Sequence, residues 1–304
     1  MDMAAHAASI VVDWGTTSLR ATLVTDAGEA LDRLETQQGI STLAKGEHEG
    51  VLMQALRSWF AAHGALPVVA LGMITSRNGW VEVDYVPCPA GPSKLAAGTV
   101  SRMLPNGSKL VFLPGLTDRA GRPFPDIMRG EETQVVGYGL ERDLTVILPG
   151  THSKWARIED GCIGRFQTFV TGEVFALLIN HSFIARGATQ PAVDDPAAFR
   201  RGLREAAGTG AMLSLLFSAR TGVLAKQLSA DELRSYVSGL VIGQEFRQAR
   251  EEGWFAAGDD VAIVGNDGLN ALYGVAAEVF GLKALEGSGN EAIRGALAVL
   301  RAAV

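Results

Sequence analysis

The stretch IVVDWGTTSLRATLV, residues 10–24, constrains the fold most, because it encodes two strands joined by a turn rich in glycine and hydroxyl groups. Short β-branched runs on both sides of the turn predict a buried antiparallel pair. Gly15 allows the backbone to approach a ligand closely, and the amides of a tight turn form an anion-binding concavity. The turn residues that we expect to join Gly15 around a phosphate are Thr16, Thr17 and Ser18.

Asp13 ends the first of these strands, directly before the turn. A carboxylate in this position can hold hydrated Mg²⁺, a hard ion that keeps several of its waters. We therefore expect Asp13 to position magnesium. An aspartate that merely caps a tight turn gives the same pattern, so both interpretations stay open at this point.

A second turn of the same kind, LPGTHSKW at residues 148–155, follows half a chain later. Two such turns can hold the phosphates of a nucleotide from both sides of a cleft, whereas the sequence contains neither a P-loop nor a dinucleotide fingerprint after a strand. Lys154 suits a phosphate contact, but it also suits a solvated hairpin position. The residues expected at the phosphates are Gly150, Thr151, His152, Ser153 and Lys154.

A third segment, VGNDGL at residues 264–269, joins a buried strand to a helix. The free amides of a helix N-terminus and two glycines leave room for a flat base or a ribose. We expect Gly265, Asn266 and Gly268 to border adenosine. An ordinary strand-to-helix connection with Asn266 as the N-cap is the alternative.

The rest of the chain alternates strands with helices, and 304 residues suit two domains rather than one core. We place the boundary near Pro149, which gives a first lobe of residues 1–148 and a second of 149–304. The further strands expected are 30–36, 67–71, 109–113, 144–148, 155–158, 163–169 and 260–264. The helices expected are 47–62, 131–138, 173–181, 196–207, 231–252, 267–280 and 290–301.

Net charge and composition indicate which kinds of binding partner the protein can have. The formal net charge is −6 and no basic run stands out, so we expect no nucleic acid and no membrane partner. Two isolated cysteines, Cys88 and Cys162, and an N-terminal stretch without a secretory pattern favour a cytoplasmic protein. The apolar helices of residues 196–252 either pack internally or form a homodimer face, and we expect a homodimer.

Seven motifs, in order and spread over nearly the whole chain, resemble the 2-dehydro-3-deoxygalactonokinase family of the sugar kinase/Hsp70/actin class. They are DWGTTSLRA, GMITSRNGW, YVPCPAG, FLPG, MRGEETQ, LPGTHSKW and TGEVFALL. The resemblance implies an α/β, two-lobed actin-like ATPase (ribonuclease H-like) fold, with duplicated mixed-sheet domains and a central cleft. It also implies ATP and Mg²⁺ as cofactors.

The activity that the resemblance implies is phosphorylation of 2-dehydro-3-deoxy-D-galactonate at its 6-hydroxyl by ATP. The product would feed an aldolase in the De Ley–Doudoroff route of galactonate degradation. Residue chemistry alone leaves two alternatives open. One is a kinase for the epimer 2-dehydro-3-deoxygluconate, because one inverted hydroxyl is read by one or two hydrogen bonds. The other is a non-catalytic, nucleotide-dependent sugar sensor, which in related families usually carries a DNA-binding domain.

Related sugar kinases place a catalytic carboxylate at the start of a helix just before the second phosphate turn. The corresponding segment here is DIMRGEETQ, residues 126–134. We rank Glu131 first as the group that orients or deprotonates the acceptor hydroxyl, Glu132 second and Asp126 third. Acidic residues in a first turn also complement the helix dipole without any catalytic role.

The substrate carries a carboxylate, which a guanidinium binds well. The segment ITSRNGW, residues 74–80, follows a buried strand and is rich in suitable groups. The first substrate candidates are Ser76, Arg77 and Asn78, with Trp80 as a wall, although Arg77 also suits an exposed loop. Thr171 and Glu173 are expected to contact sugar hydroxyls, with a simple helix cap as the alternative.

Overall fold

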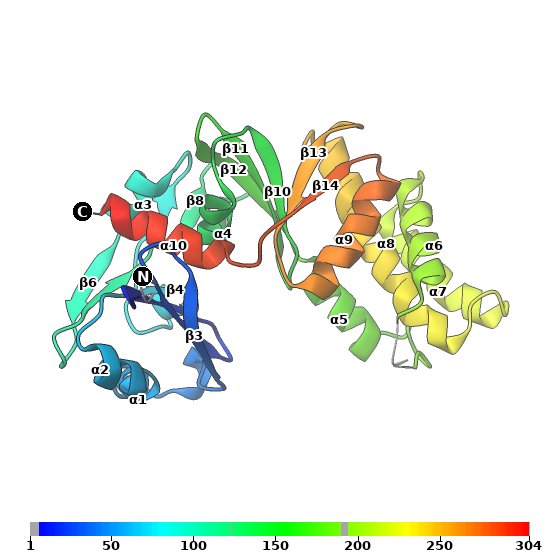
Figure 1. Ribbon diagram of the computed structural model, residues 1–304. Coiled ribbons are helices and arrows are strands. Elements are labelled where there is room, and N and C mark those ends of the chain that lie inside the picture. The colour runs from blue at the N-terminus through cyan, green and yellow to red at the C-terminus, as the bar shows by residue number, and fades with distance from the viewer. Residues whose placement is uncertain (1–5, 122, 190–193, 304) are drawn as a thin grey trace, which may run out of the picture. The chain divides into compact units, whose positions relative to one another are not determined.

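The computed structural model describes residues 6–121, 123–189 and 194–303. The chain forms two compact units (Figure 1). Unit 1 contains Met1–Asp143, Ile158–Phe166 and Asn290–Val304, and unit 2 contains Leu144–Arg157 and Gln167–Gly289. The division into lobes at residue 148 stays a prediction, and these units differ from it chiefly in the closing helix, which belongs to unit 1.

A six-stranded sheet of order β3-β2-β1-β4-β7-β6 forms the centre of unit 1. β1 pairs antiparallel with β2 and parallel with β4, so the predicted hairpin begins the sheet. Trp14, Leu19 and Phe112 are fully buried against this sheet. The strands are β1 (Ser9–Trp14), β2 (Leu19–Val24), β3 (Ala30–Thr36), β4 (Val68–Leu71), β6 (Val100–Met103) and β7 (Lys109–Phe112).

The helix expected at 47–62 is interrupted: α1 (His48–Ala55) ends one residue before α2 (Arg57–His63). Leu56 between them leaves helical geometry, at φ −91° and ψ 5°, and its side chain is fully buried. Periodicity continues across this point, which explains why the sequence predicted one helix.

The remaining elements of unit 1 include a small sheet of order β5-β8-β9 and three helices. Their bounds are β5 (Val86–Pro87), β8 (Leu116–Asp118), β9 (Asp126–Met128), α3 (Pro92–Ala97), α4 (Glu131–Tyr138) and α10 (Glu291–Ala302). α4 and α10 approach at two glycines. A Cβ added to Gly137 would lie 1.8 Å from the Glu291 carbonyl oxygen, and one added to Gly295 would lie 1.8 Å from that of Thr133. This close packing holds the start of α4 in place.

The second large sheet has the order β12-β11-β10-β13-β14, the same arrangement as β3-β2-β1-β4-β7. Most of its residues belong to unit 2, whereas the end of β11 and the first part of β12 belong to unit 1. The repeat agrees with the predicted duplication. Its strands are β10 (Leu144–Leu148), β11 (Ser153–Glu159), β12 (Cys162–Phe169), β13 (Asp260–Ile263) and β14 (Lys283–Glu286). β11 and β12, which correspond to the expected strands 155–158 and 163–169, are joined by a tight turn in which Asp160 and Gly161 both have positive φ.

Five helices accompany this sheet (Figure 1). They are α5 (Thr171–His181), α6 (Pro196–Ala207), α7 (Met212–Leu224), α8 (Ala230–Glu251) and α9 (Asp267–Val279). Ile147, Trp155 and Phe246 are buried in the core between sheet and helices. No helix in the described part of the chain is long and apolar enough to span a membrane.

Candidate active site

The first phosphate turn joins β1 to β2 and is closed by a hydrogen bond from the Gly15 amide to the Ser18 carbonyl, 2.9 Å. Thr16 and Thr17 are exposed at its tip. Gly39 packs against the turn so closely that a Cβ there would lie 2.2 Å from the Thr17 carbonyl carbon, and its amide donates to the Thr17 carbonyl oxygen. The turn is therefore held from behind while its tip faces outward, as an anion-binding turn requires.

Asp13, at the end of β1, lies beside Gly72, which follows β4. A Cβ on Gly72 would be 2.9 Å from Asp13 Oδ1, and Gly72 has a φ of 85°. Burial raises the pKa of Asp13, while nearby Arg20 lowers it and the Glu131 carboxylate raises it. Two residues far apart in sequence, Asp13 and Glu131, are thus brought close enough within unit 1 to interact electrostatically.

Glu131 and Glu132 occupy different environments although they are adjacent at the start of α4. Glu131 is partly exposed and accepts a hydrogen bond from the Arg129 amide, 2.9 Å. Glu132 is 1% exposed, and both of its carboxylate oxygens accept from the Gly130 amide at 2.9 and 2.8 Å. Glu132 therefore closes the start of the helix, whereas Glu131 is the one beside Asp13.

Burial, with a further contribution from Glu131, raises the pKa of Glu132 to about 8 from its ordinary value of 4.5. Between these values the folded chain binds a proton that the unfolded chain releases. The free energy of unfolding should therefore decrease as pH rises from 4.5 to 8, by something of the order of 4 kcal/mol from this group. Since glutamine does not ionise, Glu132→Gln should flatten this dependence. The midpoints of urea unfolding at pH 5.5 and 8.5 measure this pH dependence. Equal changes in the wild type and in Glu132→Gln would contradict the raised pKa of Glu132.

The segment of residues 74–80, which we expect to bind substrate, begins within η2 (Met73–Thr75). Ser76 is buried, and its hydroxyl has no hydrogen-bond partner among the described residues. Arg77 and Asn78 are exposed. The Trp80 ring is partly buried and stacks on His48 at 6.1 Å, so it contributes to the core as well as to the loop. The loop thus offers one buried hydroxyl and two exposed polar side chains.

Sequence reasoning missed Arg129, which fixes this loop relative to α4. Its guanidinium donates to Thr75 Oγ1 at 2.6 Å and to the Val83 carbonyl at 2.9 Å, and it lies 4.2 Å from the centre of the Tyr85 ring. The available signal was a lone cation directly before a glycine and two glutamates. A guanidinium that contacts a hydroxyl, a carbonyl and an aromatic ring at once holds the loop rigidly.

The second phosphate turn joins β10 to β11 in unit 2. Thr151 and His152 are exposed, whereas Ser153 and Lys154 are buried. Lys154 Nζ donates to the His152 carbonyl at 3.0 Å, so this lysine is not the solvated hairpin residue that was one alternative. The tip of this turn, at Thr151 and His152, is therefore exposed, whereas its last residues, Ser153 and Lys154, are buried.

The start of α5 packs against this turn. A Cβ on Gly172 would lie 2.5 Å from the Gly150 carbonyl oxygen, and the Glu173 amide donates to the Thr151 carbonyl at 3.0 Å. His152 Nε2 and Glu173 Oε2 are 2.6 Å apart. Glu173, which the sequence assigned to sugar hydroxyls, thus adjoins the phosphate turn.

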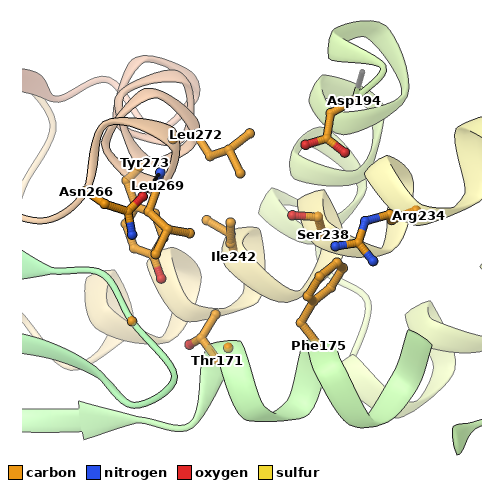
Figure 2. A pocket seen from close by; sticks show the side chains of 13 residues that line it. Thr171, Phe175, Asp194, Arg234, Ser238, Ile242, Asn266, Leu269, Leu272 and Tyr273 are labelled. Carbon is orange, nitrogen blue, oxygen red and sulfur yellow. Dashed lines mark hydrogen bonds between the residues drawn. The ribbon is translucent and has the colours of Figure 1, made fainter. Parts of the chain in front are cut away.

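The same turn borders a cavity of about 320 Å³ in unit 2 (Figure 2). α5, α8 and α9 supply most of its walls, and the predicted adenosine loop supplies another. Phe175, Ile242, Leu269 and Leu272 make much of the lining apolar. The remaining lining residues are Gly150, Thr171, Gly172, Asp194, Arg234, Ser238, Asn266, Gly268 and Tyr273. A concave, mostly apolar site with a few polar groups is typical of small-ligand binding.

Asn266 and Gly268, which the sequence analysis assigns to adenosine, both line this cavity, and their contact with adenosine stays a prediction. Asn266 also caps α9, since its Oδ1 accepts from the Leu269 amide at 3.0 Å. Gly265 lies just outside, with a Cβ there 3.0 Å from Asn270 Oδ1. The N-cap interpretation and the binding interpretation are thus compatible. Thr171 lines the cavity too, which the sequence had placed with the sugar.

Several cavity residues were not singled out from the sequence. Phe175 lies within the motif TGEVFALL but was given no role there, and Arg234 and Tyr273 lie in helices without a motif. Phe175 and Arg234 face each other, with the guanidinium carbon 5.0 Å from the ring centre (Figure 2). Tyr273 is buried in α9 and donates to the carboxylate of Glu245. The cation–π contact of Arg234 with Phe175 and the hydrogen bond from Tyr273 to Glu245 both join residues that are distant in sequence. No local sequence pattern reveals such contacts.

Comparisons with known proteins show the family to which the chain belongs. A family model described as 2-keto-3-deoxy-galactonokinase matches residues 13–300. The 2-dehydro-3-deoxygalactonokinase of Escherichia coli (strain K12) is 30% identical over 296 residues, covering 97% of this chain and 98% of the relative. A crystal structure of a Sinorhizobium meliloti protein carrying the same enzyme name matches with a TM-score of 0.85 at 33% identity, covering 97% of this chain and 98% of that one.

A carbohydrate kinase from Novosphingobium aromaticivorans matches with a TM-score of 0.52 at 12% identity, covering 99% of this chain and 92% of that chain. At this identity the match shows the fold alone, which is the expected actin-like α/β fold. The family match spans both phosphate turns, the Glu131 segment and the cavity residues. This chain belongs to the 2-keto-3-deoxy-galactonokinase family.

Proposed function

We propose that the protein transfers the γ-phosphoryl group of ATP to the 6-hydroxyl of 2-dehydro-3-deoxy-D-galactonate, giving the 6-phosphate and ADP. The observation that carries the proposal is that Gly72 joins Asp13 to the start of α4 in unit 1. A Cβ on Gly72 would lie 2.9 Å from Asp13 Oδ1, and one on Gly130, directly before Glu131, would lie 3.6 Å from Gly72 Cα. The match to the kinase family covers both carboxylates, since it spans residues 13–300. Phosphoryl transfer needs a group at the metal and a group at the acceptor hydroxyl, and these two carboxylates supply both.

Asp13 would hold Mg²⁺ through water. Asp13 fits a magnesium ion in two respects. A cation would offset the free-energy cost of burying this carboxylate near Glu131. Carboxylate oxygen is also the kind of ligand that Mg²⁺ prefers. No cluster of three or more metal-binding side chains occurs among the described residues, which suits an ion held by one carboxylate, water and phosphates. When bound, Mg²⁺ neutralises charge on the phosphates.

Glu131 would accept or orient the proton of the acceptor hydroxyl. It is the partly exposed member of the acidic pair, and its hydrogen bond from the Arg129 amide fixes its direction. Glu132 is completely occupied at the helix start, so we assign it the role of holding Gly130 rather than a role in proton transfer.

The sugar acid would bind near the 74–80 loop. Ser76 offers a buried hydroxyl without a partner among the described residues, and Arg77 is an exposed guanidinium able to pair with the substrate carboxylate. Asn78 and Trp80 complete the candidate set. Arg129 supports the loop through its hydrogen bond to Thr75. Its other side-chain hydrogen bond goes to the Val83 carbonyl, which is not a substrate candidate.

The nucleoside of ATP would occupy the cavity of unit 2, and the two phosphate turns would bind its phosphates. Thr171 lines this cavity together with Asn266 and Gly268, so we reassign it from the sugar to the nucleotide. His152 and Glu173 form a pair beside the second turn and would contact phosphate or its bound water. Cytoplasmic localisation and a homodimer remain expectations from the sequence.

Filling the cavity should weaken ATP binding selectively. A Cβ on Gly268 meets only Asn266 Oδ1 at 3.5 Å, so Gly268→Leu should fold and project into the nucleoside space. We expect the KM for ATP to rise by about tenfold or more and the KM for the sugar acid to change little. Gly274→Leu is the matched control, since Gly274 lies in the same helix and a Cβ there meets nothing within 4 Å. If Gly268→Leu and Gly274→Leu changed the KM for ATP equally, the cavity would not be part of the ATP site.

Substrate identity is tested by coupled ADP release with a panel of aldonic and 2-keto-3-deoxy acids. We expect the highest kcat/KM with 2-dehydro-3-deoxy-D-galactonate and a lower value with the gluconate-derived epimer. A preference for the epimer would redirect the proposal to that acid. If no acid stimulates ADP release, the kinase assignment is wrong for this chain.

A further inference from the structure

A buried carboxylate in unit 2 has no part in the roles described so far. Glu245 lies in the middle of α8 and is 3% exposed. Its Oε1 accepts from Ser153 Oγ at 2.8 Å and from Trp155 Nε1 at 2.7 Å, and its Oε2 accepts from the Tyr273 hydroxyl at 2.6 Å. The Thr171 hydroxyl is a fourth hydrogen-bond partner.

These four donors come from the parts of unit 2 that would handle ATP. Ser153 and Trp155 begin β11, directly after the second phosphate turn. Thr171 is the first residue of α5, and Tyr273 lies in α9. Thr171 and Tyr273 line the cavity, whereas Glu245 itself does not. One carboxylate therefore joins the start of β11 to two residues that line the nucleoside cavity, Thr171 and Tyr273. Figure 2 shows these two lining residues.

All four partners are uncharged groups that can donate a hydrogen bond, and Trp155 Nε1, which cannot accept one, requires an acceptor at this position. An ionised carboxylate has about four lone-pair sites, enough for all four, whereas a glutamine would direct its NH₂ group toward some of these donors. Burial raises the pKa of Glu245, and the hydrogen bonds from Thr171, Tyr273, Trp155 and Ser153 lower it. Burial and Glu245 raise the pKa of Tyr273, so the phenol remains a donor.

We propose that Glu245 is a positioning residue for nucleotide binding, which acts by fixing Thr171 and Tyr273 in the cavity wall relative to Ser153 after the phosphate turn. Glu245 touches neither substrate in this assignment. The inference rests on the proposed function in one respect, namely that the unit 2 cavity receives ATP.

The first test compares Glu245→Gln with Val237→Ala. Val237 is a fully buried residue of the same helix, outside the four hydrogen bonds, so its truncation lowers stability without disturbing the carboxylate. We expect Glu245→Gln to weaken ADP binding in calorimetry and to raise the KM for ATP, each by roughly ten- to a hundredfold, with the KM for the sugar acid nearly unchanged. Val237→Ala should lower the melting temperature and leave all three values near those of the wild type.

The second test applies even if Glu245→Gln fails to fold. Ser153→Ala and Tyr273→Phe each remove one donor while leaving the carboxylate in place. We expect each to weaken ADP binding by about two- to tenfold, and the double variant to deviate from the product of the two effects, because both act through Glu245. Unaltered ADP affinity in Glu245→Gln, or purely multiplicative effects of the pair, would overturn the proposal.

ADP calorimetry separates this inference from the proposed function, because it needs no sugar acid. A wild-type protein that binds ADP but phosphorylates no acid would refute the proposed reaction and leave the role of Glu245 open to the same variants. A wild-type protein that does not bind ADP would refute the role of Glu245.

Discussion

Glu131→Gln is expected to reduce kcat for phosphorylation of the sugar acid by about 10²- to 10⁴-fold, the usual contribution of a general base. The substitution keeps the shape of the side chain and the acceptor for the Arg129 amide, but it removes the group able to take the proton of the acceptor hydroxyl. ADP affinity should stay close to that of the wild type, because the cavity assigned to the nucleoside lies in unit 2. Steady-state kinetics together with ADP calorimetry measure the two quantities.

Glu132→Gln is the matched control for this prediction. The residue is adjacent and is also a glutamate, but its carboxylate is buried on the Gly130 amide, so its loss should affect activity much less than that of Glu131. The opposite pattern, with Glu131→Gln fully active and Glu132→Gln inactive, would move the base by one residue. Loss of activity in both variants with normal melting temperatures would indicate that the acidic pair acts as a unit.

Asp13→Asn is expected to lower kcat by at least about 100-fold, which corresponds to roughly 2.7 kcal/mol of transition-state stabilisation. An amide preserves the packing beside Gly72 but weakens the attraction for a hydrated divalent cation. The apparent Mg²⁺ requirement should therefore rise. Kinetics at increasing Mg²⁺ concentration provide the measurement.

Asp126→Asn serves as the control for Asp13, because Asp126 was the third candidate base and lies in β9. Its Oδ1 accepts from the Ile127 amide at 2.7 Å, a contact within its own strand. We expect this variant to retain most of its activity. Asp13→Asn with more than a tenth of wild-type activity and an unchanged Mg²⁺ requirement would contradict the assignment of Asp13.

Local patterns predicted the two hairpins well. β1, β2, β10 and β11 are short, apolar and bounded by glycine turns, and the structure contains all four. α7 and β14 were missed, because α7 has exposed apolar residues such as Leu213 and β14 is mostly exposed without clear alternation. The position of α10 could not be predicted, since its packing depends on Gly137 and Gly295, which are far apart in sequence.

The candidate site was predictable only as far as its turns. Adjacent carboxylates such as Glu131 and Glu132 share one sequence context, and only the three-dimensional structure shows that one is buried on an amide while the other lies near Asp13. Glu245 could not be found, because an acidic residue in a long helix usually belongs to a solvated face. Its partners come from three other elements and converge only on folding.

The position of the transferred phosphate tests the central claim most directly. Wild-type protein is incubated with ATP, Mg²⁺ and 2-dehydro-3-deoxy-D-galactonate, and the proton-coupled ³¹P spectrum of the product is recorded. We predict an acid-dependent phosphate monoester signal split into a triplet by the two protons of the C6 methylene group, together with an equal amount of ADP. A doublet from a secondary hydroxyl, or inorganic phosphate as the only new species, would contradict the account.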